Sequence, residues 1–191
     1  KEEVILLEGL PEPDQVIEID LPKVAKSSLI VTILSLLLLT VVKMTIEKEF
    51  VFSITLWTIG IFIVGYIALI ILHEFFHLFG FRIFSNIPWR KMKVGINLKM
   101  GIAYATTSEL MTNRAIRKSL LLPFWLTGIL PAAIGLYIGS GLLLVLSALL
   151  IGGAAGDFSM YRQLKKFPND WLIQDHPSEP KLYLFNPDAG R

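Results

Sequence analysis

Residues Ile71 to Gly80 read ILHEFFHLFG. Two histidines and one glutamate stand in a run that is otherwise apolar. Apolar runs of this kind form core helices or membrane spans, and both environments penalise ionisable side chains that lack a partner. His73, Glu74 and His77 therefore require a compensating partner.

The spacing of these residues, H-E-x-x-H, indicates a metal ion. On a helix with about 3.6 residues per turn, His73 and His77 lie on one face and can share one ion. Glu74 lies about 100° further round the helix, where it can act as general base on a zinc-bound water. Zinc accepts imidazole and carboxylate ligands, and a catalytic zinc takes three protein ligands and one water. The motif thus predicts a Zn²⁺ site that needs a third ligand.

Asp157, in GGAAGDFSMY, is the favoured third ligand. It closes a long uncharged run, and the small residues around it allow helices to approach closely. Three alternatives stay open. Asp157 could simply mark the end of a span, His176 in QDHPSEP is a second candidate ligand, and Glu109 is a weaker one. The chain has no cysteine, so thiolate ligands are excluded.

Composition indicates a membrane protein. Hydrophobic residues make up 53% of the chain, and the mean hydropathy is +0.61. The 18% of charged residues are segregated, since none falls within 29–42, 50–72 or 119–156. The apolar run at 29–42 predicts a first transmembrane span that is not cleaved as a signal peptide. The longer run from Phe50 to Phe84 predicts a second span. The turn at 139–141 divides the last run into two further spans.

Between the second and third spans, apolar and other residues alternate from Val94 to Tyr104, which is typical of a strand. Such a strand could add a substrate peptide to its open edge, or it could be a plain structural hairpin. A helix is expected to restart near Thr112 or Asn113, and QVIEIDL at 15–21 predicts a short extended strand. The predicted fold class is an all-α integral membrane protein with about four transmembrane helices and a short β-strand or hairpin region between the second and third.

Loop charges predict the orientation in the cell membrane. Basic residues strongly outnumber acids between the second and third spans. Glu109 is the one acid there, and the basic residues are Arg82, Arg90, Lys91, Lys93, Lys99, Arg114, Arg117 and Lys118. The positive-inside rule makes this loop cytoplasmic, and both termini with it. The basic residues lack aromatic interleaving, which argues against nucleic acid as a partner.

The segments LHEFFHLFGFRIF, GIAYATT, RKSLLLPFW and GDFSMYRQLKKFPNDWLIQDHPSE together resemble the putative zincin peptidase family of small membrane proteins, distantly similar to site-2 proteases. The resemblance covers roughly residues 15–183. It implies intramembrane zinc proteolysis, with His73, His77 and Asp157 as zinc ligands and Glu74 as base. The expected organisation is a polar N-terminal tail (1–28), a membrane-embedded metallopeptidase domain (29–166) and a cytoplasmic C-terminal tail (167–191).

Two classes of function remain. The first is a zinc metalloprotease that hydrolyses peptide bonds of membrane-associated proteins or peptides near the cytoplasmic boundary of the lipid bilayer. The second is a non-catalytic membrane scaffold or binding protein with a structural metal site. Glu74 favours the enzyme, because a structural zinc site needs no general base.

Overall fold

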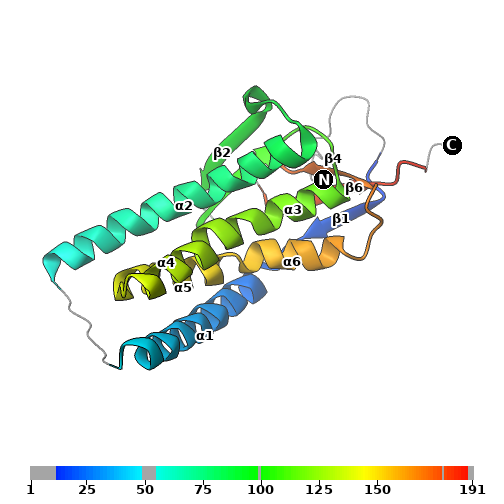
Figure 1. The fold of residues 1–191 in the computed structure, drawn as a ribbon. Helices are drawn as coiled ribbons and strands as arrows, with labels where there is room; N and C mark the ends of the chain where they lie inside the picture. Colours follow the sequence, from blue (N-terminus) through cyan, green and yellow to red (C-terminus); the bar gives the residue numbers. More distant parts are fainter. Residues whose placement is uncertain (1–11, 49–54, 99, 178, 189–191) are drawn as a thin grey trace.

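Four long apolar helical segments dominate the molecule (Figure 1). The computed structural model describes residues 12–48, 55–98, 100–177 and 179–188. By length and composition, four segments could cross a membrane: Leu21–Glu47, Leu56–Ser85, Asn113–Tyr137 and Gly141–Leu164. The predicted set of four apolar helices is therefore present, in the predicted order.

The first two segments are single helices with clear end signals. Helix α1 (Leu21–Glu47) begins upstream of the uncharged run at Leu29, because Asp20 accepts a hydrogen bond from the backbone N–H of Lys23. Helix α2 (Leu56–Ser85) starts at a reciprocal capping box between Thr55 and Thr58. It ends at Asn86, which adopts a left-handed conformation. Residues 50–54 of the predicted second span lie outside the described residues.

The third segment restarts where the sequence predicts, with Thr112 as the N-cap of α3 (Asn113–Pro123). A π-helical turn, η2 (Phe124–Ile129), connects α3 to α4 (Leu130–Tyr137). Pro123 and Pro131 flank this turn, and each lacks the backbone N–H that a regular α-helix uses. The regular hydrogen-bond ladder gives way to a wider turn between the two prolines, which rotates the side chains within it.

The fourth segment follows a tight turn in which Gly139 has a φ of 69°. It consists of α5 (Gly141–Gly153) and α6 (Ala155–Leu164), separated by a break at Ala154. The predicted helical hairpin with its turn at 139–141 is confirmed. At this turn the buried amine of Lys43 donates a hydrogen bond to the Gly139 carbonyl (2.7 Å) and pairs with Glu47, which ties α1 to the α4–α5 turn.

The region between α2 and α3 forms a hairpin and not one continuous strand from Val94 to Tyr104. After the 3-10 turn η1 (Trp89–Lys91), β2 (Met92–Asn97) pairs antiparallel with β3 (Ile102–Thr107). The apolar alternation runs through the connecting turn, where Gly101 has a φ of 65°. Alternation alone does not show where the chain reverses between two strands. Lys99, which belongs to the predicted strand, lies outside the described residues.

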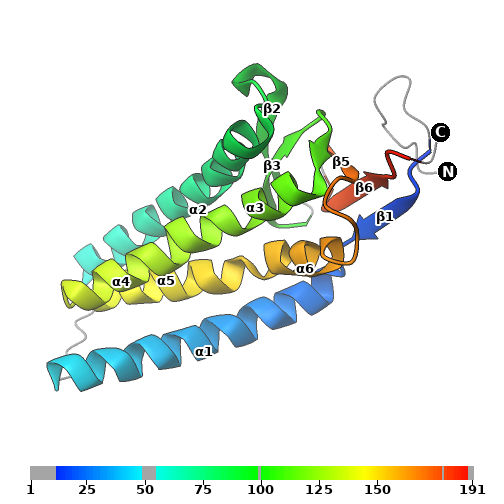
Figure 2. The ribbon, with the colours of Figure 1, turned by 45° about the vertical axis from the view of Figure 1, so that its right-hand side comes forward.

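A second sheet joins distant parts of the chain, so the all-α assignment needs correction to helices plus small antiparallel sheets. Its strand order is β1-β6-β5-β4, with β1 (Gln15–Glu18), β6 (Lys181–Phe185), β5 (Leu172–Asp175) and β4 (Met111–Thr112). The strand expected in QVIEIDL is confirmed as β1. Figure 2 shows β1 and β6 side by side, so both segments expected to be tails contribute to one sheet. Alternation in QVIEIDL indicates a strand, but it does not indicate which distant strand pairs with it.

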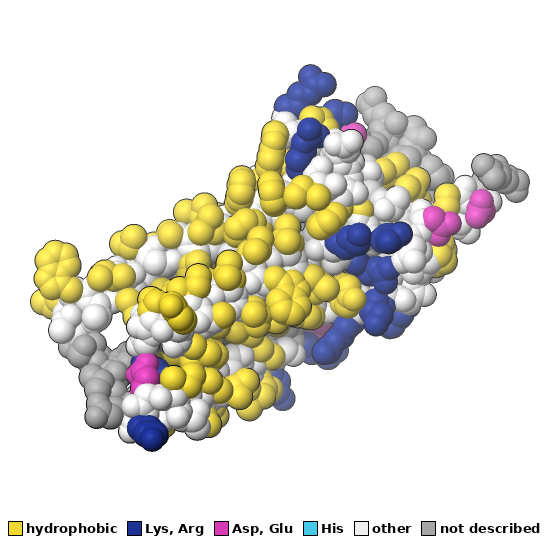
Figure 3. All heavy atoms as spheres, in the orientation of Figure 1, with side chains coloured by type: hydrophobic (Ala, Val, Ile, Leu, Met, Phe, Trp, Pro, Cys, Tyr) yellow, Lys and Arg dark blue, Asp and Glu magenta, His cyan; other side chains and the backbone are white. Residues whose placement is uncertain are grey.

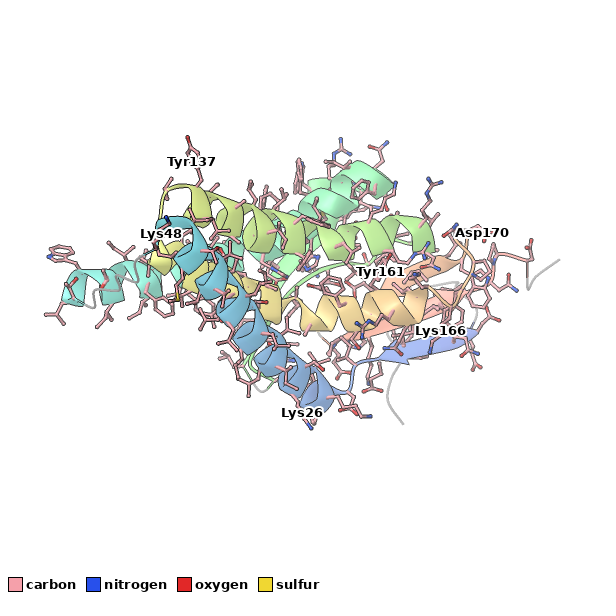
Figure 4. The ribbon with its side chains drawn as sticks, turned by 60° about the horizontal axis from the view of Figure 1, so that its bottom comes forward. Lys26, Lys48, Tyr137, Tyr161, Lys166 and Asp170 are labelled. Carbon is pink, nitrogen blue, oxygen red and sulfur yellow. The ribbon has the colours of Figure 1, made fainter. Side chains whose placement is uncertain are left out.

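The main core lies between this sheet and the neighbouring ends of the helices. Its fully buried members come from both: Met111, Ile116, Leu164, Ile173, Leu182 and Leu184. Away from this end the helices present apolar side chains outward, as the belt in Figure 3 shows. Figure 4 places Lys48 and Tyr137 at one end of the bundle, and Lys166 and Asp170 at the other. An apolar belt between two polar ends is the surface that a lipid bilayer accommodates.

Candidate metal centre

Three side chains that could bind a metal meet between α2 and α6. Nε2 of His73 lies 3.1 Å from Oδ2 of Asp157, and Nε2 of His77 lies 3.3 Å from Oδ1 of the same carboxylate. One ligand atom from each residue lies within 4.8 Å of the other two. Within the described residues this is the one group of three or more His, Cys, Asp or Glu side chains close enough to hold an ion.

The donor set fits zinc in its chemistry. Nε2 of His73 and Nε2 of His77 approach different oxygens of the Asp157 carboxylate, at 3.1 and 3.3 Å, so both imidazoles face the same carboxylate. Two imidazoles and one carboxylate form a ligand set that catalytic zinc sites use, with a fourth position left for water or substrate.

The opposite nitrogen of each histidine is held by a hydrogen bond. Nδ1 of His77 lies 3.1 Å from the Ser119 carbonyl oxygen, which can only accept, so Nδ1 carries the hydrogen. Nδ1 of His73 lies 3.3 Å from Oγ1 of Thr127, whose own hydroxyl donates to the Pro123 carbonyl at 2.8 Å. Both arrangements place a hydrogen on Nδ1 and turn Nε2 toward Asp157, where its lone pair would be available to a bound metal ion. Partners of this kind fix the tautomer and orientation of metal-binding histidines.

Local features of the helices bring these partners into reach. Thr127 lies in the π-helical turn η2, a kind of irregularity that often occurs at functional sites. Gly80 lets α2 approach α3 closely, because a Cβ there would lie 2.8 Å from the backbone and side chain of Ser119. Asp157 lies in the first turn of α6, where the helix dipole favours a negative charge.

Glu74 is buried, with 8% of its surface exposed, and that surface lines a cavity next to the three residues. Its carboxyl group makes no hydrogen bond within the described part of the chain. An uncommitted carboxylate beside a candidate metal centre is available to exchange protons with water or substrate.

The cavity has a volume of about 220 Å³ and lies between the helices and the strands. His73, Glu74, His77 and Asp157 line it from the helical side, and Asp175, His176 and Glu179 line it from the β5–β6 side. Strand β3 contributes five consecutive residues, Ile102 to Thr106. Because alternate side chains of a strand point to opposite faces, an unbroken run of five means that the cavity follows the edge of β3.

The other candidate ligands lie elsewhere. His176 shares the cavity, but it is not in the group around Asp157, and its Nδ1 accepts a hydrogen bond from the backbone N–H of Glu179 (2.9 Å). Glu109 pairs with Lys91 at 2.7 Å, outside the cavity. The structure therefore brings His73, His77 and Asp157 together, and neither alternative joins them.

Sequence reasoning missed Ser119, Thr127 and Asp175. The Ser119 contact uses a backbone carbonyl, which any residue has, so no sequence signal exists for it. A lone threonine between Pro123 and Pro131 was a usable signal for Thr127, since a hydroxyl beside a broken helix can bond a neighbouring segment. Asp175 reaches the cavity only because β5 pairs with distant strands.

Asp175 has an unusual environment for an acid outside the helical segments. Burial raises the pKa of the Asp175 carboxyl to about 7. The nearby Thr106 hydroxyl, His176 backbone amide and His77 oppose this rise in pKa without cancelling it, although the His176 N–H donates to the Lys181 carbonyl at 3.0 Å. The Thr106 oxygen also lies 3.1 Å from the His176 carbonyl, so its single proton serves only one of the two acceptors at a time.

A comparison with protein families adds an independent finding. A profile of the putative zincin peptidase family matches residues 66–172, more than half of the chain. The chain belongs to this family. The match begins within α2 and ends at the start of β5, so it contains the metal-binding group, Glu74 and β3. No curated protein and no solved structure matches the chain.

Family membership implies zinc, and His73, His77 and Asp157 lie close enough to bind it. The resemblance noted from the sequence is therefore confirmed at the level of the family, which indicates a zinc metallopeptidase.

Proposed function

We propose that this protein is an intramembrane zinc endopeptidase that cleaves membrane-associated polypeptides near the cytoplasmic boundary of the bilayer. The observation that carries the proposal is the arrangement around one cavity of His73, His77 and Asp157 with the carboxylate of Glu74. Family membership supports the reaction class.

Each residue has a separate role in this proposal. His73 and His77, oriented through their Nδ1 hydrogens, and Asp157 hold the ion. Zinc, when bound, supplies a Lewis acid that polarises the substrate carbonyl and makes water more acidic. Glu74 accepts a proton from the attacking water and passes it to the nitrogen of the leaving amine. Burial of the site keeps bulk water away and strengthens these electrostatic interactions.

Strand β3 is the element that would hold the substrate. It pairs with β2 on one edge, and its other edge follows the cavity. An extended peptide added to that edge would receive backbone hydrogen bonds and lie alongside Glu74 and the metal-binding group. Peptide bonds inside a helix are inaccessible to attack. A strand that binds an unwound substrate segment would hold the peptide bond in an extended form that water can attack.

The cytoplasmic location rests on charge and on the placement of the site. The strands and the basic ends of α3 and α6 lie at one end of the bundle, as Figures 1 and 3 show. Positive charge of this kind marks the cytoplasmic side of membrane proteins. The cavity and both described chain ends then face the cytoplasm.

The test compares zinc content and cleavage in purified wild type and four variants. His73→Ala, His77→Ala and Asp157→Asn should lose zinc and activity, because each removes a ligand. Glu74→Gln should keep zinc and lose at least about 100-fold in turnover, since it lacks only the general base. A mixture of apolar synthetic peptides, with the products identified by mass spectrometry, reveals cleavage whatever the natural substrate is.

Two results would contradict the proposal. Zinc loss in Glu74→Gln with zinc retained in the histidine variants would reverse the assigned roles. Full zinc occupancy in the wild type, with no peptide cleaved, would favour the non-catalytic scaffold with a structural metal.

A further inference from the structure

The cavity wall opposite the metal-binding group contains an acid that the proposed reaction does not use. Four carboxylates line the cavity, those of Glu74, Asp157, Asp175 and Glu179, and no lysine or arginine of the described residues lines it. Asp157 and Glu74 have roles as ligand and base. Glu179 pairs with Lys181 at 2.9 Å, and this partner lowers the pKa of the Glu179 carboxyl. Asp175 is the remaining acid.

Asp175 has no ion-pair partner within the described residues. Its neighbours are the hydroxyl of Thr106, the backbone N–H of His176 and, further away, His77. A desolvated carboxylate without a cation is costly to keep, and the raised pKa of Asp175 reflects that cost. The proposed zinc would be held on the opposite wall by His73, His77 and Asp157, so a second cation beside Asp175 would supply the opposite charge that this carboxyl lacks locally.

The rest of the lining indicates what carries that cation. Apolar side chains from several elements surround the acids: Ile19, Val24, Phe81, Leu120, Met160 and Leu182. A lysine or arginine side chain has an apolar stem and a charged head, so it can cover such surface while its head reaches a carboxylate. Metal cations are a poorer match, because no second acid is close enough to Asp175 to form a group of three ligands in the described chain.

Asp175 also lies beside the proposed substrate path along β3. Asp175 contacts Thr106, the last of the five β3 residues that follow the cavity. A peptide added to the β3 edge would present alternate side chains about 6.6 to 6.8 Å apart on each face. One of these side chains would face Asp175 while the peptide bond a few residues away faces Glu74.

We propose that Asp175 forms a specificity subsite for a lysine or arginine side chain of the substrate, a few residues from the cleaved bond. The inference rests on the proposed peptidase function. The preferred substrate is then an apolar segment flanked by a basic residue. This is the pattern found where a transmembrane helix meets the cytoplasm, which is also where the site would lie.

The test uses synthetic peptides that differ in one atom group. An apolar host peptide carries a single lysine, moved one position at a time along the sequence, and each peptide is matched by one with norleucine, which has the same stem without the amine. At one position kcat/KM should favour lysine by about tenfold or more, as expected for a hydrogen bond between charged groups in a buried site. Asp175→Asn should reduce the ratio to about one.

Controls separate this effect from general changes. Asp170→Asn makes the same chemical change at an exposed position outside the cavity and should keep the lysine preference. Zinc content should match the wild type in both variants. If Asp175→Asn does not fold, Asp175→Ser removes the carboxylate and keeps a small polar group.

Binding measurements distinguish failure of this inference from failure of the proposed function. The affinities of the same peptides for zinc-loaded Glu74→Gln, with and without Asp175→Asn, need no catalysis. Lysine and norleucine peptides that bind and react equally well at every position in the wild type would overturn the subsite. Tighter binding of the lysine peptide with no cleavage by the wild type would support the subsite and reject the peptidase.

Discussion

Two kinds of side-chain contact meet at the candidate metal centre: those among the possible ligands, and those that fix the orientation of the two histidines. His73 and His77 face Asp157 with Nε2, and Thr127 and Ser119 hold the opposite nitrogens. Thr127 is the more informative of the two, because its contact uses a side chain and can be removed without disturbing the backbone. Thr127 is fully buried, and its hydroxyl accepts a hydrogen bond from Nδ1 of His73 and donates one to the Pro123 carbonyl.

Replacement of Thr127 by valine should lower zinc affinity about 10- to 100-fold, since His73 loses the acceptor that fixes its Nδ1 hydrogen. Valine has nearly the same shape, so packing is preserved. Zinc titration against a competing chelator measures the change. Thr127→Ser should restore affinity because it keeps the hydroxyl.

Ser147→Ala is the matched control for this prediction. Ser147 is equally buried, but among the described residues its hydroxyl bonds only to the Leu143 carbonyl within α5. Its removal should leave zinc affinity unchanged. Equal affinity in Thr127→Val and wild type would show that Thr127 does not orient His73.

At the scale of elements, irregularities in the helices and the edge of one hairpin create the site. The π-helical turn η2 directs Thr127 toward α2, and the break at Ala154 starts α6 just before Asp157. The hairpin β2–β3 supplies the cavity wall through the edge of β3. Regular helices alone would give none of these features.

If substrate adds to β3 as a strand, methylation of its backbone nitrogens should inhibit with a period of two. In an antiparallel pair, alternate N–H groups of the added strand point toward its neighbour, and the others point away. The measurement is kcat/KM for a series of peptides, each with one N-methylated position near the cleaved bond. Inhibition that is uniform along the peptide, or absent, would contradict strand addition.

The whole molecule has two polar ends and an apolar middle. Both described chain ends and the β2–β3 hairpin lie at the end with the sheets, and Lys48 and Tyr137 lie at the other (Figures 1 and 4). The metal-binding group lies between α2 and α6, toward the strands.

Single cysteines test which end is cytoplasmic, and the absence of native cysteine makes each label unambiguous. In intact cells, a membrane-impermeant thiol reagent should label Lys48→Cys and Tyr137→Cys and spare Ser108→Cys and Asp170→Cys. All four should react after permeabilisation. Labelling of Ser108→Cys and Asp170→Cys alone would reverse the orientation, and labelling of all four in intact cells would exclude a membrane-spanning topology.

Local patterns in the sequence predicted the four apolar helical segments and placed His73 and His77 on one face of a helix. Charge-free runs predict spans because ionisable groups are costly in hydrocarbon, and H-E-x-x-H predicts its own geometry because residues four apart share a helix face. Asp157 was the favoured third ligand because it is the acid that ends the last uncharged run, with His176 and Glu109 as alternatives. The restart of the third helical segment was predicted near Thr112 or Asn113, and Thr112 is the N-cap, because a cap is a local signal.

Three features became visible only in the folded molecule: the pairing of β1, β6, β5 and β4, the partners of the two histidines, and the place of Asp175 in the cavity wall. The physical reason is the same in each case. Strand pairing between the two ends of the chain, a backbone carbonyl used as an acceptor, and a carboxylate brought to a cavity by its neighbours all depend on contacts between residues far apart in sequence. Local periodicity and spacing carry no information about such contacts, whereas they describe a helix face completely.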